Sequence, residues 1–112
     1  AACLLADGVS VVLDGVYSRG VWRQAAREAA ARYGAEALAV VCACPDDMAL
    51  ERICSRYAAG QSLSDARPEL FARQKEHFET PPPDDDCIWI DTGAAHAAGV
   101  AEVLARLGLT WP

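Results

Sequence analysis

Three short apolar runs, separated by longer helical patterns, constrain the fold of this 112-residue chain more than any other feature. They cover residues 9–13, 37–43 and 87–91. Most of their apolar residues are valine, isoleucine or alanine. Continuous apolar runs of this length are typical of strands that are covered on both faces. Strands that alternate with helices form parallel sheets. We therefore expect an α/β fold, a three-layer structure in which helices flank a parallel sheet.

Helix signals lie between and after these runs. Apolar residues recur at helical spacing over residues 19–33, 46–59 and 94–107. Ser18 is positioned to cap the first of these helices, and Asp65 to start another that has Pro68 in its first turn. The two helices around the polar loop "GQSLSD" form a hairpin, residues 52–74, that can close over a ligand as a lid.

Charge and cysteine content exclude several classes of function. The formal net charge of −6 argues against a broad nucleic-acid or anionic-membrane surface. No apolar run reaches the roughly 18 residues that a membrane span needs. The five cysteines show neither a Cys-x-x-Cys pair nor a His/Cys ligand spacing, which argues against zinc and predicts buried, reduced thiols in the cytoplasm. Cys42 and Cys44 share one strand face, where ligation or oxidation is the alternative to packing.

Acidic and basic side chains follow the first apolar run. Asp14 comes directly after it, where a carboxylate can hold Mg²⁺ through water or take a proton from a hydroxyl. The alternative is an ordinary turn aspartate before Gly15. Arg19 and Arg23 lie four residues apart on the helix that follows, either close to Asp14 and a ligand or on a solvated surface.

A second cluster lies on the predicted hairpin and after the third run. Arg52 and Arg56 are also four residues apart and can reach one polyphosphate, one stacking on a base and one pairing with phosphate; ion pairs with Glu51 are the alternative. Gln74 either contacts a substrate or is a buried, hydrogen-bonded amide. Backbone groups in "IDTG" can approach a base, or Asp91 and Thr92 only cap the last helix.

Four stretches taken in order resemble a known family. They are "SVVLDGVYSRGVWRQAAREAAARYG", "VVCACPDDMALERICSR", "SLSDARPELFARQKEHFE" and "WIDTG". Together they resemble the carboxyl-terminal two-thirds of P-loop kinase-like proteins. The nearest group is the small AAA-family ATP-binding domain that often follows an aminoglycoside-phosphotransferase-like domain, a relative of polynucleotide, gluconate and adenylate kinases.

The resemblance implies a role for each candidate residue. Asp14 matches the acid at the end of the Walker-B-like strand, which serves Mg²⁺ or substrate activation. Arg52 and Arg56 match the lid pair, the first against adenine and the second on phosphate. The resemblance also implies that Arg19 and Arg23 lie near the acceptor substrate. It implies that the "IDTG" loop, which contains Asp91 and Thr92, passes close to adenine.

The G-x-x-x-x-G-K-[ST] loop, which binds the phosphates in that family, does not occur in these 112 residues. The chain also starts as if partway through a helix. We therefore expect one truncated domain, a partial P-loop fold. Either residues 9–13 and 37–43 pair directly in a smaller sheet, or an upstream segment or second chain completes the sheet. The parent activity would be Mg²⁺-dependent phosphoryl transfer from ATP to a small-molecule hydroxyl, with this chain inactive alone. The alternative is a non-catalytic nucleotide-binding or protein-interaction module.

Overall fold

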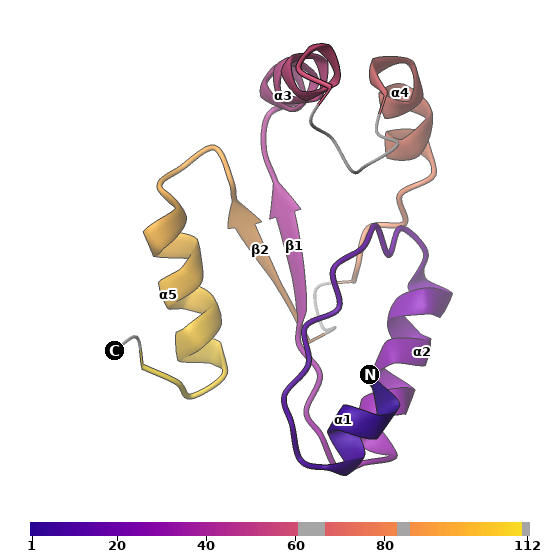
Figure 1. Cartoon of the computed structure of the whole chain (residues 1–112), viewed down its shortest axis with the longest axis vertical. Coiled ribbons are helices and arrows are strands. Elements are labelled where there is room, and N and C mark those ends of the chain that lie inside the picture. Colours follow the sequence, from indigo (N-terminus) through magenta and orange to yellow (C-terminus); the bar gives the residue numbers. More distant parts are fainter. Residues whose placement is uncertain (61–66, 83–85, 111–112) are drawn as a thin grey trace. The chain divides into compact units, whose positions relative to one another are not determined.

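The structure is a computed structural model that describes residues 1–60, 67–82 and 86–110 (Figure 1). The chain divides into two compact units. The first contains residues 1–39 and 77–87, and the second contains residues 40–76 and 88–112. Among the described residues, no helix is both long and apolar enough to cross a lipid bilayer.

The described residues of the first unit include two helices. α1 (Ala2–Ala6) ends before Gly8, whose φ of 74° is a conformation that favours glycine and is common just after a helix. α2 (Gly20–Ala31) is rich in alanine, the residue with the strongest helix preference, and packs against α1. The helix that the sequence predicts over residues 19–33 is confirmed. The observed helix begins one residue later and ends two residues earlier.

Two parallel strands form the sheet. Hydrogen bonds from Ala39 N to Asp86 O (2.9 Å) and from Thr92 N to Ala43 O (2.7 Å) mark the two ends of the pairing between β1 (Ala39–Ala43) and β2 (Cys87–Asp91). Both arrows point the same way in Figure 1. Parallel neighbours need a long crossover connection, and the helices between β1 and β2 provide it.

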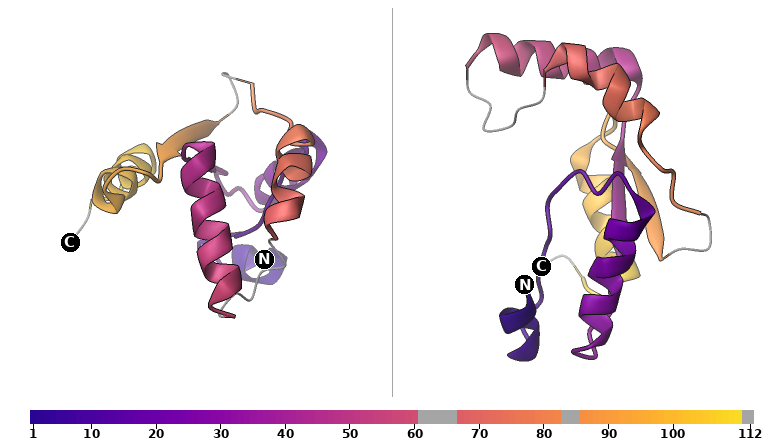
Figure 2. Two further views of the ribbon diagram at one scale, coloured as in Figure 1. Left: turned by 90° about the horizontal axis from the view of Figure 1, so that it is seen from above. Right: turned by 90° about the vertical axis from the view of Figure 1, so that its right-hand side faces the viewer.

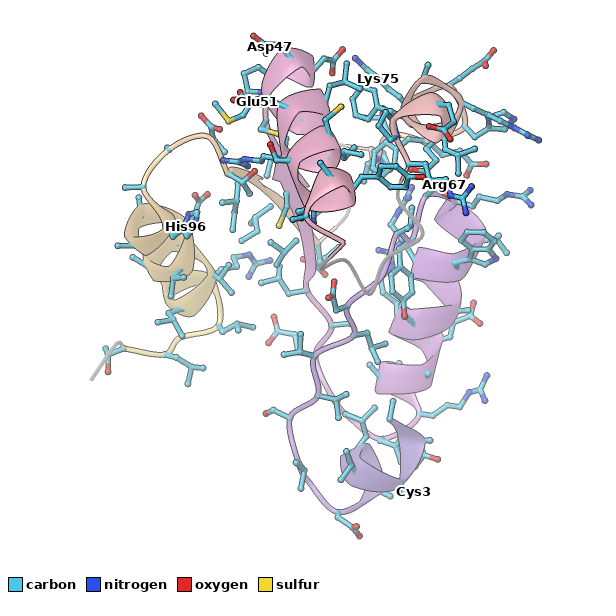
Figure 3. All side chains as sticks on the ribbon, turned by 45° about the horizontal axis from the view of Figure 1, so that its top comes forward. Cys3, Asp47, Glu51, Arg67, Lys75 and His96 are labelled. Atoms are coloured by element: carbon cyan, nitrogen blue, oxygen red, sulfur yellow. The ribbon has the colours of Figure 1, made fainter. Side chains whose placement is uncertain are left out.

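Three helices belong to the second unit, α3 (Asp46–Ala58), α4 (Pro68–Glu76) and α5 (His96–Arg106). α3 and α4 lie side by side, as Figure 2 shows, and an ion pair joins Asp46 on α3 to Lys75 on α4. Figure 3 shows Asp47 and Glu51 on α3 and Lys75 on α4. α3 and α4 are the two helices expected on either side of the polar loop, and their closure over a ligand as a lid of residues 52–74 stays a prediction. The predicted loop and its Asp65 cap fall on residues 61–66, outside the described residues.

α5 approaches β2 closely at one glycine. A Cβ atom built on Gly99 would overlap Cγ2 of Ile90, so this position accepts no larger residue without a shift of one element. Gly99 is buried accordingly. The glycine therefore determines how closely the helix and the strand can pack.

The first apolar run is not a strand, which corrects the prediction for residues 9–13. Val12 is 93% exposed, and Val9 and Leu13 are exposed as well. A strand forms only where a neighbour supplies hydrogen bonds, and within the described residues β1 and β2 pair only with each other. A three-layer sheet is therefore not shown, and its completion by another segment or chain stays a prediction.

Burial of apolar side chains is sparse throughout the described residues. Ala30 on α2 is their only buried hydrophobic residue. Burial alternates along β1, so that Val40 and Cys42 face outward, and Cys3 and Cys54 are exposed too. The prediction that the cysteines are buried is therefore wrong for Cys3, Cys42 and Cys54. A sheet of two strands leaves the face with Cys42 uncovered, and α1 and α3, which carry the other two, contain no buried residue.

Candidate functional site

Arg52 on α3 contacts Thr92, the residue that follows β2. Its Nη2 donates to the carbonyl oxygen of Thr92 at 3.0 Å, and its Nη1 lies 3.5 Å from Oγ1 of the same residue. Thr92 in turn donates from N (2.7 Å) and from Oγ1 (3.0 Å) to the carbonyl oxygen of Ala43, the last residue of β1. The contact brings together two of the residues that the sequence predicts for nucleotide binding. It lies at the carboxyl ends of both strands, where open α/β sheets bind ligands.

The turn after β2 is held by Asp91. Its Oδ1 accepts a hydrogen bond from Gly93 N at 2.7 Å. The N-cap of α5 is Ala95, which makes no side-chain cap bond, so the interpretation of Asp91 or Thr92 as helix caps is wrong. A Cβ on Gly93 would lie 3.4 Å from Sδ of Met48, which places this side chain of α3 against the turn.

Arg56 lies one helical turn beyond Arg52 and is exposed, like Arg52. Its Nε donates to the carbonyl oxygen of Arg52 at 3.3 Å, near the end of α3. In the part of the chain that the structure describes, no ion pair joins Glu51 to either arginine. The alternative of a salt-bridged helix surface is therefore wrong here, and both guanidinium groups face solvent.

Gln74 on α4 is exposed. The alternative of a buried, hydrogen-bonded amide is thus wrong for this side chain. Its contact with a substrate stays a prediction.

Asp14 lies in the irregular segment between α1 and α2, and its side chain is exposed. No group of three or more His, Cys, Asp or Glu side chains among the described residues is arranged to hold a metal ion. A site built on Asp14 would therefore offer at most two such side chains from this part of the chain. Mg²⁺ accepts such a site, because it retains several waters and takes one or two carboxylates together with substrate phosphates.

Arg19 and Arg23 have different environments although they are one turn apart. Arg19 is exposed; its Nε lies 3.7 Å from Oε1 of Glu79, and its guanidinium is 5.9 Å from the ring centre of Trp22. Arg23 is 8% exposed and donates from Nη1 to the carbonyl oxygen of Tyr17 and from Nη2 to that of Glu79, both at 2.8 Å. The solvated-surface alternative is wrong for Arg23.

Glu79 is a residue that sequence reasoning missed. Its Oε2 accepts a hydrogen bond from Gly20 N at 2.6 Å, so a side chain 59 positions away caps α2. Ser18 does not form the predicted side-chain cap; its carbonyl oxygen accepts from Glu79 N at 2.8 Å. No local pattern could identify this cap, since the partner lies after the hairpin. Met48 was missed as well, because methionine at helical spacing looks like ordinary packing.

Comparison with known proteins gives one match. A family model described as an AAA domain matches residues 1–81. The matched residues include most of the candidates, namely Asp14, Arg19, Arg23, Arg52, Arg56 and Gln74, and end before Asp91 and Thr92. No curated protein and no solved structure matches the chain.

Proposed function

We propose that this chain contributes the site of a domain that binds ATP with Mg²⁺ and transfers a phosphoryl group to a hydroxyl group of a small molecule, an activity that the chain alone does not have. The chain belongs to the AAA domain family of P-loop kinase-like nucleotide-binding domains. The γ-phosphoryl group supplies the transferred unit, and Mg²⁺ supplies charge neutralisation on the phosphates. The residues of this chain bind and orient these groups.

The contact between Arg52 and Thr92 carries the proposal. The two residues come from α3 and from the end of β2. The resemblance to P-loop kinase-like proteins leads us to expect both near adenine. A guanidinium fixed through Nη1 and Nη2 offers a flat cationic face to a base, as arginine does more readily than lysine. Met48, against the Gly93 turn, supplies apolar surface beside it.

The phosphate side of the site is assigned to Arg56. Its Nε bonds to a main-chain oxygen of its own helix, and its guanidinium is exposed. Paired N–H donors on a planar group suit phosphate oxygens. Because α3 carries both arginines, binding of the base and of the phosphates depends on the orientation of this one helix.

Asp14 is the proposed metal-binding and proton-accepting residue. An exposed carboxylate next to Gly15 can hold a water of hydrated Mg²⁺ or accept the proton of the attacking hydroxyl. Arg19 and Gln74 are the proposed contacts of the acceptor, because both side chains are exposed and carry hydrogen-bond donors.

A non-catalytic interaction module is the second candidate. The observation that favours it is the number of large apolar side chains that face solvent, among them Val12, Val16 and Tyr57. Exposed apolar surface of this kind marks interaction sites when it is contiguous.

The test is nucleotide titration combined with an assay of phosphoryl transfer. The chain, and any longer form that its gene encodes, is titrated with ATP in the presence of Mg²⁺, next to the variants R52A and R56A. R32A is the matched control, because Arg32 is an exposed arginine at the end of α2. We expect R52A and R56A to weaken binding and R32A to leave it unchanged. If ATP binds without any transfer to hydroxyl compounds, a non-catalytic nucleotide-binding module is the better description. If neither form binds ATP, both nucleotide-binding hypotheses are contradicted and the protein-interaction module is the candidate that is left.

A further inference from the structure

Arg23 is the one charged residue that the described part of the chain buries. Its guanidinium joins two main-chain carbonyl oxygens, those of Tyr17 and Glu79, and lies 5.9 Å from the ring centre of Phe78. Its Nε is buried and has no hydrogen-bond partner among the described residues. Burial of a charge is unfavourable unless the charged group is hydrogen-bonded or paired. The hydrogen bonds of Nη1 and Nη2 therefore stabilise this cation in its buried position.

The segments that Arg23 joins are also bonded to each other. Glu79 N donates to the carbonyl oxygen of Ser18 at 2.8 Å, and the Glu79 carboxylate accepts from Gly20 N. The segment that leads into α2 and the segment after α4 are therefore joined by these two hydrogen bonds in addition to those of Arg23. Removal of the Arg23 side chain would leave two buried or half-buried carbonyl oxygens without their donor.

Tyr17 has an unusual backbone conformation. Its φ of 38° is the only positive value at a non-glycine residue in the described part of the chain. Such conformations persist where the surrounding structure holds them. The Tyr17 ring folds back over the turn, since a Cβ on Gly15 would lie 3.1 Å from its Cε2. Arg23 thus bonds to Tyr17, and the Tyr17 ring lies against Gly15, the residue next to Asp14.

We infer that Arg23 is a positioning residue, which fixes the turn of residues 14–17 and thereby the direction of the Asp14 carboxylate. The inference rests on the proposed function for the role of Asp14, but not for the conformation of the turn. It differs from the sequence-based expectation that Arg23 contacts the acceptor, because a side chain buried in this way with its Nη atoms on main-chain oxygens offers little to a substrate.

The first measurement concerns the turn itself. In NMR spectra of the whole chain, the Tyr17 ring is expected to shift the Hα resonances of Gly15, and Y17L calibrates that shift by removing the ring. We expect R23M to abolish the shift and to raise amide hydrogen exchange at Gly20 and Glu79. R23K, which keeps the charge and one donor, should retain part of both effects, and R32M should change neither.

The second measurement separates positioning from a merely structural role. ATP affinity is measured by calorimetry with and without Mg²⁺. Loss of groups that orient a metal-binding residue typically weakens metal affinity about 10-fold to 100-fold. We expect R23M to reduce the Mg²⁺-dependent gain in ATP affinity to this extent and to leave Mg²⁺-free ATP binding within about twofold. D14N should lose the same gain, and the double variant should lose no more, because both changes act through one carboxylate.

The outcomes are distinguishable. Unchanged Gly15 shifts and unchanged amide exchange in R23M would overturn the inference, whatever ATP does. A disturbed turn with an intact Mg²⁺-dependent gain would also overturn it, since Arg23 would then not act on Asp14. If the parent protein shows no Mg²⁺-dependent ATP binding, the proposed function fails; the NMR and exchange results then decide whether Arg23 fixes the turn. R23K provides the same readouts if R23M does not fold.

Discussion

The guanidinium of Arg52 donates to the carbonyl oxygen of Thr92, 40 positions further along the chain. The contact links the middle of α3 to the end of β2 and leaves the face of the guanidinium open to solvent. If ATP binds as proposed, this face stacks on the base. R52K keeps the charge but loses the planar group. We expect R52K to weaken ATP binding about tenfold, which corresponds to about 1.4 kcal/mol. Calorimetric titration checks this, with R32K as the control; equal affinity in R52K and the parent would contradict the stacking role.

Thr92 also connects β2 to β1 through its hydroxyl group. T92V removes the bond from Oγ1 to the carbonyl oxygen of Ala43 and the long contact of Arg52 Nη1 with Oγ1, but leaves the bond from Thr92 N to Ala43. A hydrogen bond of this kind contributes about 0.5–1.5 kcal/mol, and we expect T92V to lower the free energy of unfolding by that amount. Urea denaturation measures the change. T80V is the matched control, because Thr80 is exposed, and a loss of equal size there would contradict the prediction.

The cap of α2 provides a test in which the sequence and the structure disagree. S18A should leave the free energy of unfolding within about 0.5 kcal/mol of the parent, because the Ser18 side chain makes no cap bond. E79A should lower it by about 1 kcal/mol, the usual cost of a lost cap. E79Q retains an acceptor for Gly20 N and should lie between them. The reverse order of S18A and E79A in thermal or urea unfolding would refute the assignment of Glu79 as the cap.

Gly99 offers a test of the packing between α5 and β2. On helix preference alone, G99A would stabilise the chain by about 1 kcal/mol. The overlap of the new methyl group with Ile90 acts in the opposite direction, at a cost of about 1–3 kcal/mol. We expect a net loss of stability in G99A. A101G at an exposed position of the same helix should show the propensity effect by itself, and a stabilised G99A would mean that the helix and strand can separate without cost.

Thiol reactivity follows from the exposure of the cysteines. Cys3, Cys42 and Cys54 are exposed, whereas Cys44 and Cys87 are partly covered. In the native protein we expect three thiols to react quickly with an aromatic disulfide reagent and two to react more slowly, and all five to react at one rate in denaturant. Serine substitution of Cys42 should remove one fast equivalent. A single native rate for all five would contradict the burial that the structure assigns.

The sequence predicts the elements whose signal is local, and it does so here for α2, α3, α5, β1 and β2. Residues 9–13 have as strong a strand pattern as β1 but form none, because pairing depends on a neighbour that no local pattern specifies. No local pattern predicts the cap from Glu79 or the bond from Arg23 to the carbonyl oxygen of Glu79, since each joins positions more than 50 residues apart. The bond from Arg23 to the carbonyl oxygen of Tyr17 is local, but it depends on the burial of the arginine. The pairing of Arg52 with Thr92 fits the family resemblance rather than any spacing rule. The roles of Asp14, Arg56 and Gln74 in binding stay predictions.

The scarcity of buried apolar side chains has a calorimetric consequence. Unfolding increases the heat capacity mainly because apolar surface becomes exposed to water. The increase is about 12–15 cal/mol/K per residue in ordinary globular proteins. Here Val12, Val16 and Trp22 already face water in the folded chain, and Ala30 is the only described hydrophobic residue that is buried. Unfolding therefore wets little additional hydrocarbon. The heat-capacity increment per residue should fall below that range, and the curve of stability against temperature should be correspondingly flat.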